Sequence, residues 1–399
     1  MLIRLSEHMI DTNRREISRH GQPLHVEPQV FDLLVYLIEN NDHVVSKDEL
    51  FATVWNGRIV SDATLASRIN AARNIIGDSG ERQGQIRTIS RRGFRFIGTF
   101  SLEDGVAPGG PAPKVGMGEP ELRQEVTFCR APDGTRLAMA AVGSGPVLVK
   151  TGSWLNHLEF DWESPVFYPL LHTLARHSHL VRFDARGSGL SDWDIGQAPT
   201  FEDMVSDLET VVDAMALEEF SLFGMSQGAA IAITYAARHP ERVRRLVLVG
   251  GYAQGRNKRG SENDARQAEA MMTMMRLGWG DEHSAFMQAF SSIYVPKGTP
   301  EQIGWFTQLQ RKAASADNAV RLRTMFDNID VSHMLSRVTI PTLVLHSRHD
   351  SVVPIEQSRM LAATIPNAKF LSLESDNHVV LHGEPAWDRL MEEIERFLH

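Results

Sequence analysis

The sequence predicts two domains of different fold class, a small α+β domain followed by a larger α/β domain with a doubly wound, mostly parallel sheet. Residues 101–121 are rich in Gly and Pro and nearly free of large apolar side chains, which is typical of a flexible linker. Before this segment, apolar residues recur at helical spacing and then alternate. After it, short apolar runs alternate with amphipathic segments. We therefore expect domains at residues 1–100 and 122–399.

Composition and charge set the class of protein. Of the 399 residues, 42% are hydrophobic and 23% are charged, which is ordinary for a globular protein. Residues 1–98 carry 13 Lys/Arg and 12 Asp/Glu, whereas the rest of the chain carries 28 Lys/Arg and 38 Asp/Glu. The net negative charge of the protein therefore lies in the second part of the chain. A single cysteine excludes an intramolecular disulfide and a thiolate metal cluster. The N-terminus has no apolar leader, and no run of about 18 apolar residues occurs, so we expect a cytoplasmic protein with no membrane partner.

The first domain has the pattern of three helices and a terminal hairpin. Residues 28–41, PQVFDLLVYLIENN, place apolar side chains at helical spacing, and Ser46 with Glu49 forms a capping box for a second helix. A third apolar face runs from residue 61 and ends at Gly77. Residues 85–98, QIRTISRRGFRFIG, alternate around a turn and predict a β-hairpin. With short strands before them, these elements describe a winged helix.

The segments DATLASRINAARNIIGD and IRTISRRGFRFIG make residues 20–98 resemble the winged-helix DNA-binding domain of the OmpR/PhoB response-regulator family. In that family the third helix enters the major groove of double-stranded DNA and the wing touches its backbone or minor groove. The resemblance implies that two groups of residues face the DNA. On the third helix these are Thr64, Ser67, Arg68 and Ala71, and in the wing they are Arg87, Arg91 and Arg92.

Charge in this region agrees with a nucleic-acid partner. Residues 63–98 contain seven arginines against two acidic side chains. A basic cluster of this kind is either a binding surface for phosphate or a solvated face. Arg68 is suited to reading a guanine edge, whereas Arg91 and Arg92 are suited to phosphate contacts. The alternative is that the domain no longer binds DNA and serves protein contacts.

In the second domain, the stretch FGMSQGAA places Ser226 between Gly224 and Gly228. This G-x-S-x-G pattern is a weak signal alone, but here a predicted strand leads directly into it and a predicted helix leads directly out. A strand–turn–helix unit of this kind is a nucleophile elbow, in which the serine hydroxyl stands exposed at the edge of the sheet. The helix N-terminus also favours developing negative charge.

A serine nucleophile needs a general base and an acid that orients the base. In this architecture they follow the serine in the order acid, then histidine, each after a strand. The segment PTLVLHSRHDSVVP supplies Asp350, and AKFLSLESDNHVVL supplies His378. We therefore predict Ser226 as nucleophile, His378 as general base and acid, and Asp350 as the group that orients the histidine. Such a triad needs neither a metal nor a cofactor, and none is expected.

The stretch FDARGSGLSDW then makes residues 124–399 resemble the α/β-hydrolase superfamily, in which an Asp-x-Arg-Gly-x-Gly-x-Ser turn recurs. The resemblance implies structural roles for Asp184 and Arg186. It also implies an oxyanion hole built from the backbone N–H of the residue after the nucleophile and one from the loop after an earlier strand. The candidates are Gln227, Ser153 and Trp154. That earlier strand ends in Thr-Gly here, whereas family members usually have His-Gly.

Residues 252–335 form an insertion before Asp350 that resembles the helical cap of hydrolases. Three segments in it have helical patterns: 262–279, 282–294 and 301–326. The insertion is rich in methionine and aromatic residues, which favours a hydrophobic ligand, although most of these side chains are expected to pack the cap itself. We expect the cavity beside the serine to be lined by Trp154, Trp162 and Met225.

Two functions follow from this combination. The first is a one-component transcriptional regulator whose second domain binds, and hydrolyses, a small apolar ester, lactone or amide. The second is a carboxylic-ester hydrolase whose first domain is only an interaction module. A third is a receptor in which the triad is kept but slow. The expected partners are double-stranded DNA and an ester- or lactone-like small molecule, and paired half-sites on DNA make a homodimer plausible.

Overall fold

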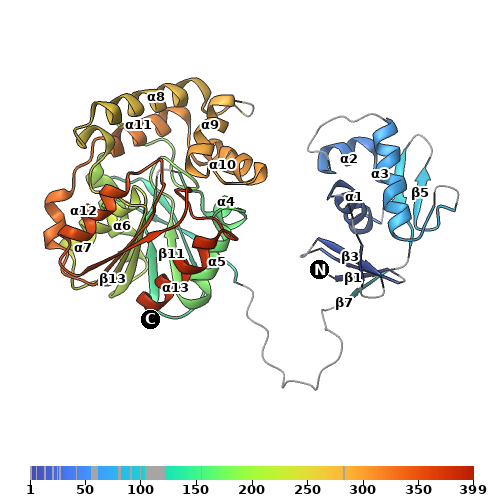
Figure 1. The fold of residues 1–399 in the computed structure, drawn as a ribbon, viewed down its shortest axis with the longest axis horizontal. Helices are drawn as coiled ribbons and strands as arrows, with labels where there is room; N and C mark the ends of the chain where they lie inside the picture. Colours follow the sequence, from blue (N-terminus) through green and yellow to red (C-terminus); the bar gives the residue numbers. More distant parts are fainter. Residues whose placement is uncertain are drawn as a thin grey trace, which may run out of the picture. The chain divides into compact units, whose positions relative to one another are not determined.

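The computed structural model describes residues 2–5, 7–12, 15–19, 22–24, 26, 28–41, 43–54, 62–79, 82–89, 92–98, 100–103, 122–153, 155–281 and 284–399. The chain forms two compact units, Met1–Met117 and Gly118–His399. Figure 1 shows both units. Most of the expected linker, from residue 104 to residue 121, lies outside the described residues.

The first unit combines an antiparallel sheet, three helices and a hairpin. The sheet has the strand order β4-β3-β2-β1-β7, and β5 pairs with β6 in a separate hairpin. The strands and helices are β1 (Leu2–Leu5), β2 (His8–Asp11), β3 (Glu16–Arg19), β4 (Gln22–Leu24), α1 (Pro28–Glu39), α2 (Lys47–Val54), α3 (Asp62–Ile75), β5 (Ile86–Ile89), β6 (Gly93–Phe96) and β7 (Ser101–Glu103). Strand β7 pairs with β1, so the first three residues of the expected linker belong to the sheet.

Apolar faces of α1 and α3 build the core of this unit, and buried polar groups fix the hairpin to it. Leu33, Leu37 and Leu65 are fully buried. The guanidinium of Arg73 is also buried and donates to the carbonyl of Ile86 at 3.0 and 2.8 Å. Because a buried charge needs partners, this arginine holds β5 against α3, and it is not available to a ligand.

The second unit is a single eight-stranded sheet, with the strand order β15-β14-β13-β12-β10-β11-β9-β8. Strands β10 to β15 are parallel, and β9 and β8 run antiparallel at one edge. The strands are β8 (Glu125–Arg130), β9 (Arg136–Val142), β10 (Val147–Lys150), β11 (His179–Phe183), β12 (Phe220–Met225), β13 (Val243–Val249), β14 (Thr342–Ser347) and β15 (Ala368–Leu373). The central strands are buried along their whole length, which explains their uninterrupted apolar runs.

Helices cover the sheet, and four of them form a separate layer. Those in the main body are α4 (Leu158–Trp162), α5 (Tyr168–His177), α6 (Phe201–Ala214), α7 (Gly228–Arg238), α12 (Ile355–Thr364) and α13 (Pro385–Leu398). Between β13 and β14 lie the 3-10 helices η1 (Arg256–Lys258) and η2 (Ser332–Arg337), with α8 (Glu262–Gly278), α9 (Ala285–Tyr294), α10 (Pro300–Ala313) and α11 (Ala316–Asp327) between them. Figure 1 shows α8–α11 gathered on one side of this unit, as a cap would be.

The strand order determines where a ligand can bind. Strand β10 lies between β11 and β12. The chain therefore passes from β10 to its neighbour on one side, β11, and then crosses over to its neighbour on the other side, β12. In open parallel sheets, ligands bind at the carboxyl ends of the strands beside such a switch point. Ser226 follows the end of β12, the direct neighbour of β10.

No helix in the described part of the chain combines the length and the apolar character that a membrane span requires.

Candidate active site

The turn that carries Ser226 is built by close packing around two glycines. Ser226 has a φ of +52°, a left-handed conformation that side-chain-bearing residues rarely adopt. A Cβ added to Gly224 would lie 2.8 Å from the Cα of Ala229, and one added to Gly228 would lie 2.4 Å from Thr151 Oγ1. Both contacts are too short for real atoms. The two glycines therefore allow α7 to begin directly after β12.

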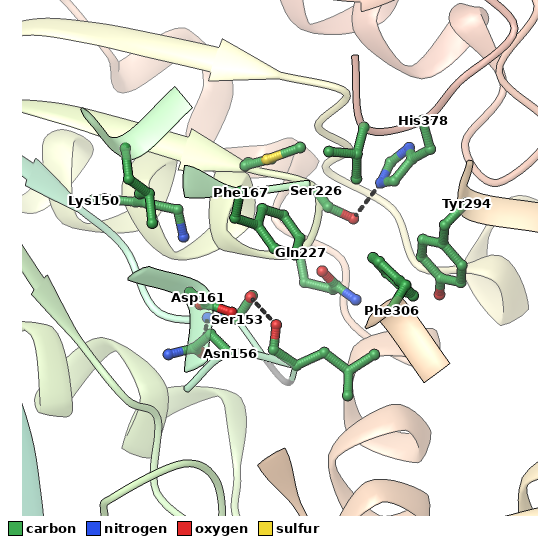
Figure 2. A pocket seen from close by; sticks show the side chains of 14 residues that line it. Lys150, Ser153, Asn156, Asp161, Phe167, Ser226, Gln227, Tyr294, Phe306 and His378 are labelled. Carbon is green, nitrogen blue, oxygen red and sulfur yellow. Dashed lines mark hydrogen bonds between the residues drawn. The ribbon is translucent and has the colours of Figure 1, made fainter. Parts of the chain in front are cut away.

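The structure brings together the three side chains that the sequence singled out. His378 Nε2 lies 2.9 Å from Ser226 Oγ, and His378 Nδ1 lies 2.6 Å from Asp350 Oδ2. Figure 2 shows the imidazole of His378 directed at the serine. The three groups come from the ends of β12, β14 and β15, and all three side chains are nearly buried. The backbone N–H of His378 donates to the carbonyl of Tyr294 at 2.9 Å, which ties the histidine loop to α9 of the cap.

Asp350 is held as an anion by its surroundings. Burial alone would raise the pKa of its carboxyl, but the charge of His378 and the hydrogen bond from it outweigh burial and hold that pKa below its ordinary value. Its Oδ1 also accepts from the N–H groups of Val352 at 2.7 Å and Val353 at 3.1 Å. An ionised carboxylate at Oδ2 keeps a proton on His378 Nδ1, so Nε2 is free to accept a proton from the serine.

His346 is a second histidine near this carboxylate. Its Nε2 lies 3.6 Å from Asp350 Oδ2, but its ring contacts the carbonyl of Val353 at 2.9 Å and the hydroxyl of Ser358 at 2.7 Å. Burial lowers the pKa of His346, although the charge of Asp350 acts in the opposite direction.

The expected oxyanion donors differ in what they contact. The N–H of Gln227 has no acceptor among the described residues and stands at the start of α7. The N–H of Ser153 donates to Asn156 Oδ1 at 3.1 Å, so it is already engaged. Trp154 lies outside the described residues. Thr151 donates its hydroxyl to the carbonyl of Gly228 at 3.0 Å and so joins the end of β10 to α7.

A cavity with about 540 Å³ of empty space, part of it open to solvent, lies beside Ser226. Figure 2 shows Phe306 and Tyr294 of the cap on its margin near His378 and Gln227, and Lys150 and Asp161 at the side away from His378. The lining is mostly apolar, with a polar end. It comprises Lys150, Ser153, Leu155, Asn156, Asp161, Phe167, Leu171, Met225, Ser226, Gln227, Tyr294, Phe306, His378 and Val379.

Met225 lines this cavity, as the sequence predicts, but Trp162 does not belong to the lining. Trp162 ends α4 and instead packs edge-on against Tyr168, with the guanidinium of Arg182 5.6 Å from its ring centre. The sequence predicted Trp162 near Ser226 because its segment follows β10. In the structure, Trp162 is the last residue of the short helix α4, and its side chain packs away from the cavity. Tyr294, which carried no sequence signal, takes a place in the wall.

Buried charges surround the polar end of the cavity. Burial raises the pKa of Asp161 to about 6 and that of Asp184 to about 7, and burial lowers the pKa of Lys150 to about 8. Asp184 accepts from the N–H groups of Leu158 at 3.2 Å and Leu190 at 2.8 Å. It therefore holds two loops beside the site, in agreement with the structural role that the resemblance implies.

Arg186 has the other structural role. Its guanidinium forms a two-pronged ion pair with Asp207, at 2.9 and 2.6 Å, and a third contact with Asp133 at 2.6 Å. Paired arginine–carboxylate geometry of this kind is strong and directional. The pair fixes the turn after β11 to α6.

The predicted DNA contacts fall into three groups. The side chains of Ser67, Arg87 and Arg92 are exposed. Arg68 is half-buried, and Ala71 packs partly against the core of the first unit, so it does not lie on a fully open face. The side chain of Thr64, and Arg91 altogether, lie outside the described part of the structure.

Comparison with known proteins identifies both units. Residues 152–385 match the model of the alpha/beta hydrolase fold, and residues 21–96 match that of the C-terminal domain of transcriptional regulatory proteins. The AB hydrolase superfamily protein YisY of Bacillus subtilis (strain 168) is 25% identical over 264 residues, which cover 64% of this chain and 94% of YisY. Pyrrolizixenacetamide deacetylase of Xenorhabdus hominickii is 26% identical over 234 residues, covering 58% of this chain and 84% of the relative.

Solved structures agree on the fold. An esterase from Exiguobacterium antarcticum superposes with a TM-score of 0.57 at 22% identity, covering 68% of this chain and 98% of the esterase. The enol-lactonase of Burkholderia xenovorans LB400 superposes with a TM-score of 0.54 at 20% identity, covering 68% of this chain and 99% of the lactonase. The chain therefore belongs to the alpha/beta hydrolase fold family, and it joins such a domain to the C-terminal DNA-binding domain of a transcriptional regulator.

Proposed function

We propose that this protein is a DNA-binding regulator whose hydrolase domain binds and hydrolyses a small ester-, lactone- or amide-like molecule. The observation that carries the hydrolytic part is the continuous chain of contacts from Ser226 through His378 to Asp350, at 2.9 and 2.6 Å. Esterase, lactonase and deacetylase are named among the similar proteins, which supports acyl transfer as the class of reaction.

Each part of the site has a role in the proposed reaction. Ser226 Oγ attacks the carbonyl carbon of the bound ligand, and its proton passes to His378 Nε2. The N–H of Gln227 stabilises the negative charge that develops on the carbonyl oxygen. His378 then gives the proton to the leaving group, and an acyl-serine remains. Water, activated by the same histidine, releases the acid and restores the serine.

The DNA-binding part rests on the matched regulator domain and on the exposed arginines Arg87 and Arg92. Fusion to such a domain has a clear use in a sensor, because turnover of the ligand would reset the signal, whereas an enzyme of metabolism gains nothing evident from it.

The test of DNA binding is a gel-shift titration with promoter DNA from the neighbourhood of the coding region. We expect a salt-dependent shift, lost in Arg87→Ala/Arg92→Ala. A shift that is absent, or insensitive to salt, would argue against regulation.

The alternative is a carboxylic-ester hydrolase whose first domain is an interaction module. The completeness of the Ser226–His378–Asp350 contacts favours it, since a pure receptor has no need of them. Under this alternative, no DNA fragment is shifted, while Ser226→Ala removes ester turnover. A receptor with a slow triad would show the reverse, a ligand-dependent shift with negligible turnover.

A further inference from the structure

A second, smaller cavity shares the nucleophile with the first. It is a small cavity with about 240 Å³ of empty space, part of it open to solvent. Ser226 and Gln227 belong to the walls of both cavities, so the two cavities adjoin at the serine. The remaining walls of the second cavity come from the segment after β13, from cap helix α11 and from the loop that carries Asp350. They are Tyr252, Arg256, Arg259, Arg323, Asp327, Val352 and Val353.

Arg256 is the unusual member of this lining. Only 5% of the residue is exposed, yet within the described residues no carboxylate lies within 4 Å of its guanidinium. Its Nη2 donates to the carbonyl of Val352 at 3.0 Å, and its Nη1 contacts the sulfur of Met271 at 2.9 Å. Both partners are neutral. A buried charge without a counter-ion is costly in a folded protein, and burial lowers the pKa of this guanidinium.

Neighbouring arginines do not share this situation. Arg323 forms an ion pair with Asp327 through both Nε and Nη2, each at 2.9 Å. Arg259 lies 4.0 Å from Asp264 and donates to a backbone carbonyl. The walls of this cavity therefore hold three guanidinium groups and one carboxylate, that of Asp327, which pairs with Arg323, and among the described residues Arg256 is the guanidinium without an ion pair. One monoanion would balance its charge.

We propose that the arginine-lined cavity binds a carboxylate of the ligand, held by Arg256, while the scissile carbonyl lies at Ser226. This inference rests on the proposed hydrolysis and names its substrate class: an ester or lactone that also carries a carboxylate. The planar, two-donor face of a guanidinium matches a carboxylate. A single negative charge suits the cavity better than the double charge of a phosphate. The apolar part of the ligand occupies the larger cavity.

Selectivity between two matched esters tests this assignment. The first is mono-p-nitrophenyl glutarate, which carries a free carboxylate, and the second is its neutral methyl ester, p-nitrophenyl methyl glutarate. We expect the wild-type chain to prefer the anionic ester in kcat/KM. In Arg256→Gln, which keeps a donor for Val352, the ratio of the two values should fall about 10- to 100-fold, the worth of a hydrogen bond to a charged group. Arg266→Gln, an exposed arginine on α8, serves as the matched control and should leave the ratio unchanged.

A binding measurement separates ligand recognition from turnover. In the Ser226→Ala chain, monoethyl glutarate should raise the melting temperature more than diethyl glutarate, because a ligand that binds only the folded state stabilises it. Adding Arg256→Gln should abolish the difference. Arg256→Lys keeps the positive charge but loses the planar, two-donor face of the guanidinium. It should restore part of the difference in melting temperature between the two ligands. This second variant keeps the test decisive if the glutamine variant folds poorly.

The outcomes divide cleanly between the two proposals. If Ser226→Ala retains turnover, hydrolysis by this site is wrong. If turnover depends on Ser226 but the wild type shows no preference for the anionic ester, or Arg256→Gln keeps the same ratio, the carboxylate site is wrong and hydrolysis stands. Stronger competitive inhibition by inorganic phosphate than by glutarate would also overturn the assignment of a carboxylate.

Discussion

Replacing Asp350 by asparagine tests how the acid controls its histidine. In the structure one oxygen of Asp350 accepts from His378 Nδ1 at 2.6 Å, and the other accepts from the N–H groups of Val352 and Val353. Asparagine has nearly the same shape but offers one acceptor and one donor. If its oxygen stays with the two backbone N–H groups, its NH₂ faces His378 Nδ1. The ring then accepts at Nδ1 and carries its proton on Nε2, where it cannot accept a proton from Ser226.

The size of the effect follows from these contacts. Restoring the productive tautomer requires the amide to flip, which leaves two buried N–H groups without an acceptor. Each such loss costs about 1–3 kcal/mol, so the productive state lies roughly 2–6 kcal/mol higher. At about 1.4 kcal/mol for each factor of ten, kcat should fall between about 30-fold and about 10⁴-fold. KM should change little, because Asp350 does not line the larger cavity.

Initial rates on p-nitrophenyl butanoate, with the folding of each variant checked by circular dichroism, measure this change. Asp376→Asn is the matched control, because Asp376 is a half-buried residue of the histidine loop that forms an ion pair with Lys297 at 3.6 Å. It should keep nearly full activity. A folded Asp350→Asn chain that keeps more than a tenth of the wild-type kcat would refute the role assigned to Asp350.

Three further predictions concern the turn, the polar wall and the wing. Gly228→Ala would place a Cβ 2.4 Å from Thr151 Oγ1 and should lower both kcat and the melting temperature, whereas Gly304→Ala, with open space at its Cβ, should be neutral or stabilise α10. Burial lowers the pKa of Lys150 to about 8 in the folded chain, so the unfolded chain binds more protons between pH 8 and 10.5 and stability rises with pH there. Lys150→Met should remove this rise, worth at most about 3 kcal/mol, as denaturant titrations at pH 7.5 and 10 would show. Arg87→Ala should reduce the slope of log binding constant against log salt by about 0.9 if Arg87 meets a DNA phosphate.

Local patterns account for what could be predicted from the sequence. The G-x-S-x-G motif between a strand and a helix signals Ser226, because steric crowding at that turn requires glycine at Gly224 and Gly228. Asp350 and His378 follow strands that end at the same edge of a parallel sheet, so their order along the chain was informative. These features depend on neighbours in sequence or on regular topology.

Features that depend on packing between distant segments could not be predicted. Residues 301–326 have one continuous helical pattern, but the structure ends α10 at Ala313 and begins α11 at Ala316 with Ser315 as N-cap. Nothing in the local pattern marks Arg256 as an arginine without a counter-ion, since this follows from where Asp327 and Val352 lie. The partial burial of Ala71 likewise follows from the packing of α3 against its own core, so the contact of Ala71 with DNA stays a prediction.

The measurement that tests the central claim most directly is hydrolysis of short-chain p-nitrophenyl esters by the full-length chain, with Ser226→Ala as the control. Ser226 Oγ lies within hydrogen-bond distance of His378 Nε2, and the account predicts turnover in the wild type that the alanine variant loses almost completely. Equal turnover in both chains, or none in the folded wild-type chain across ester, lactone and amide substrates, would contradict it.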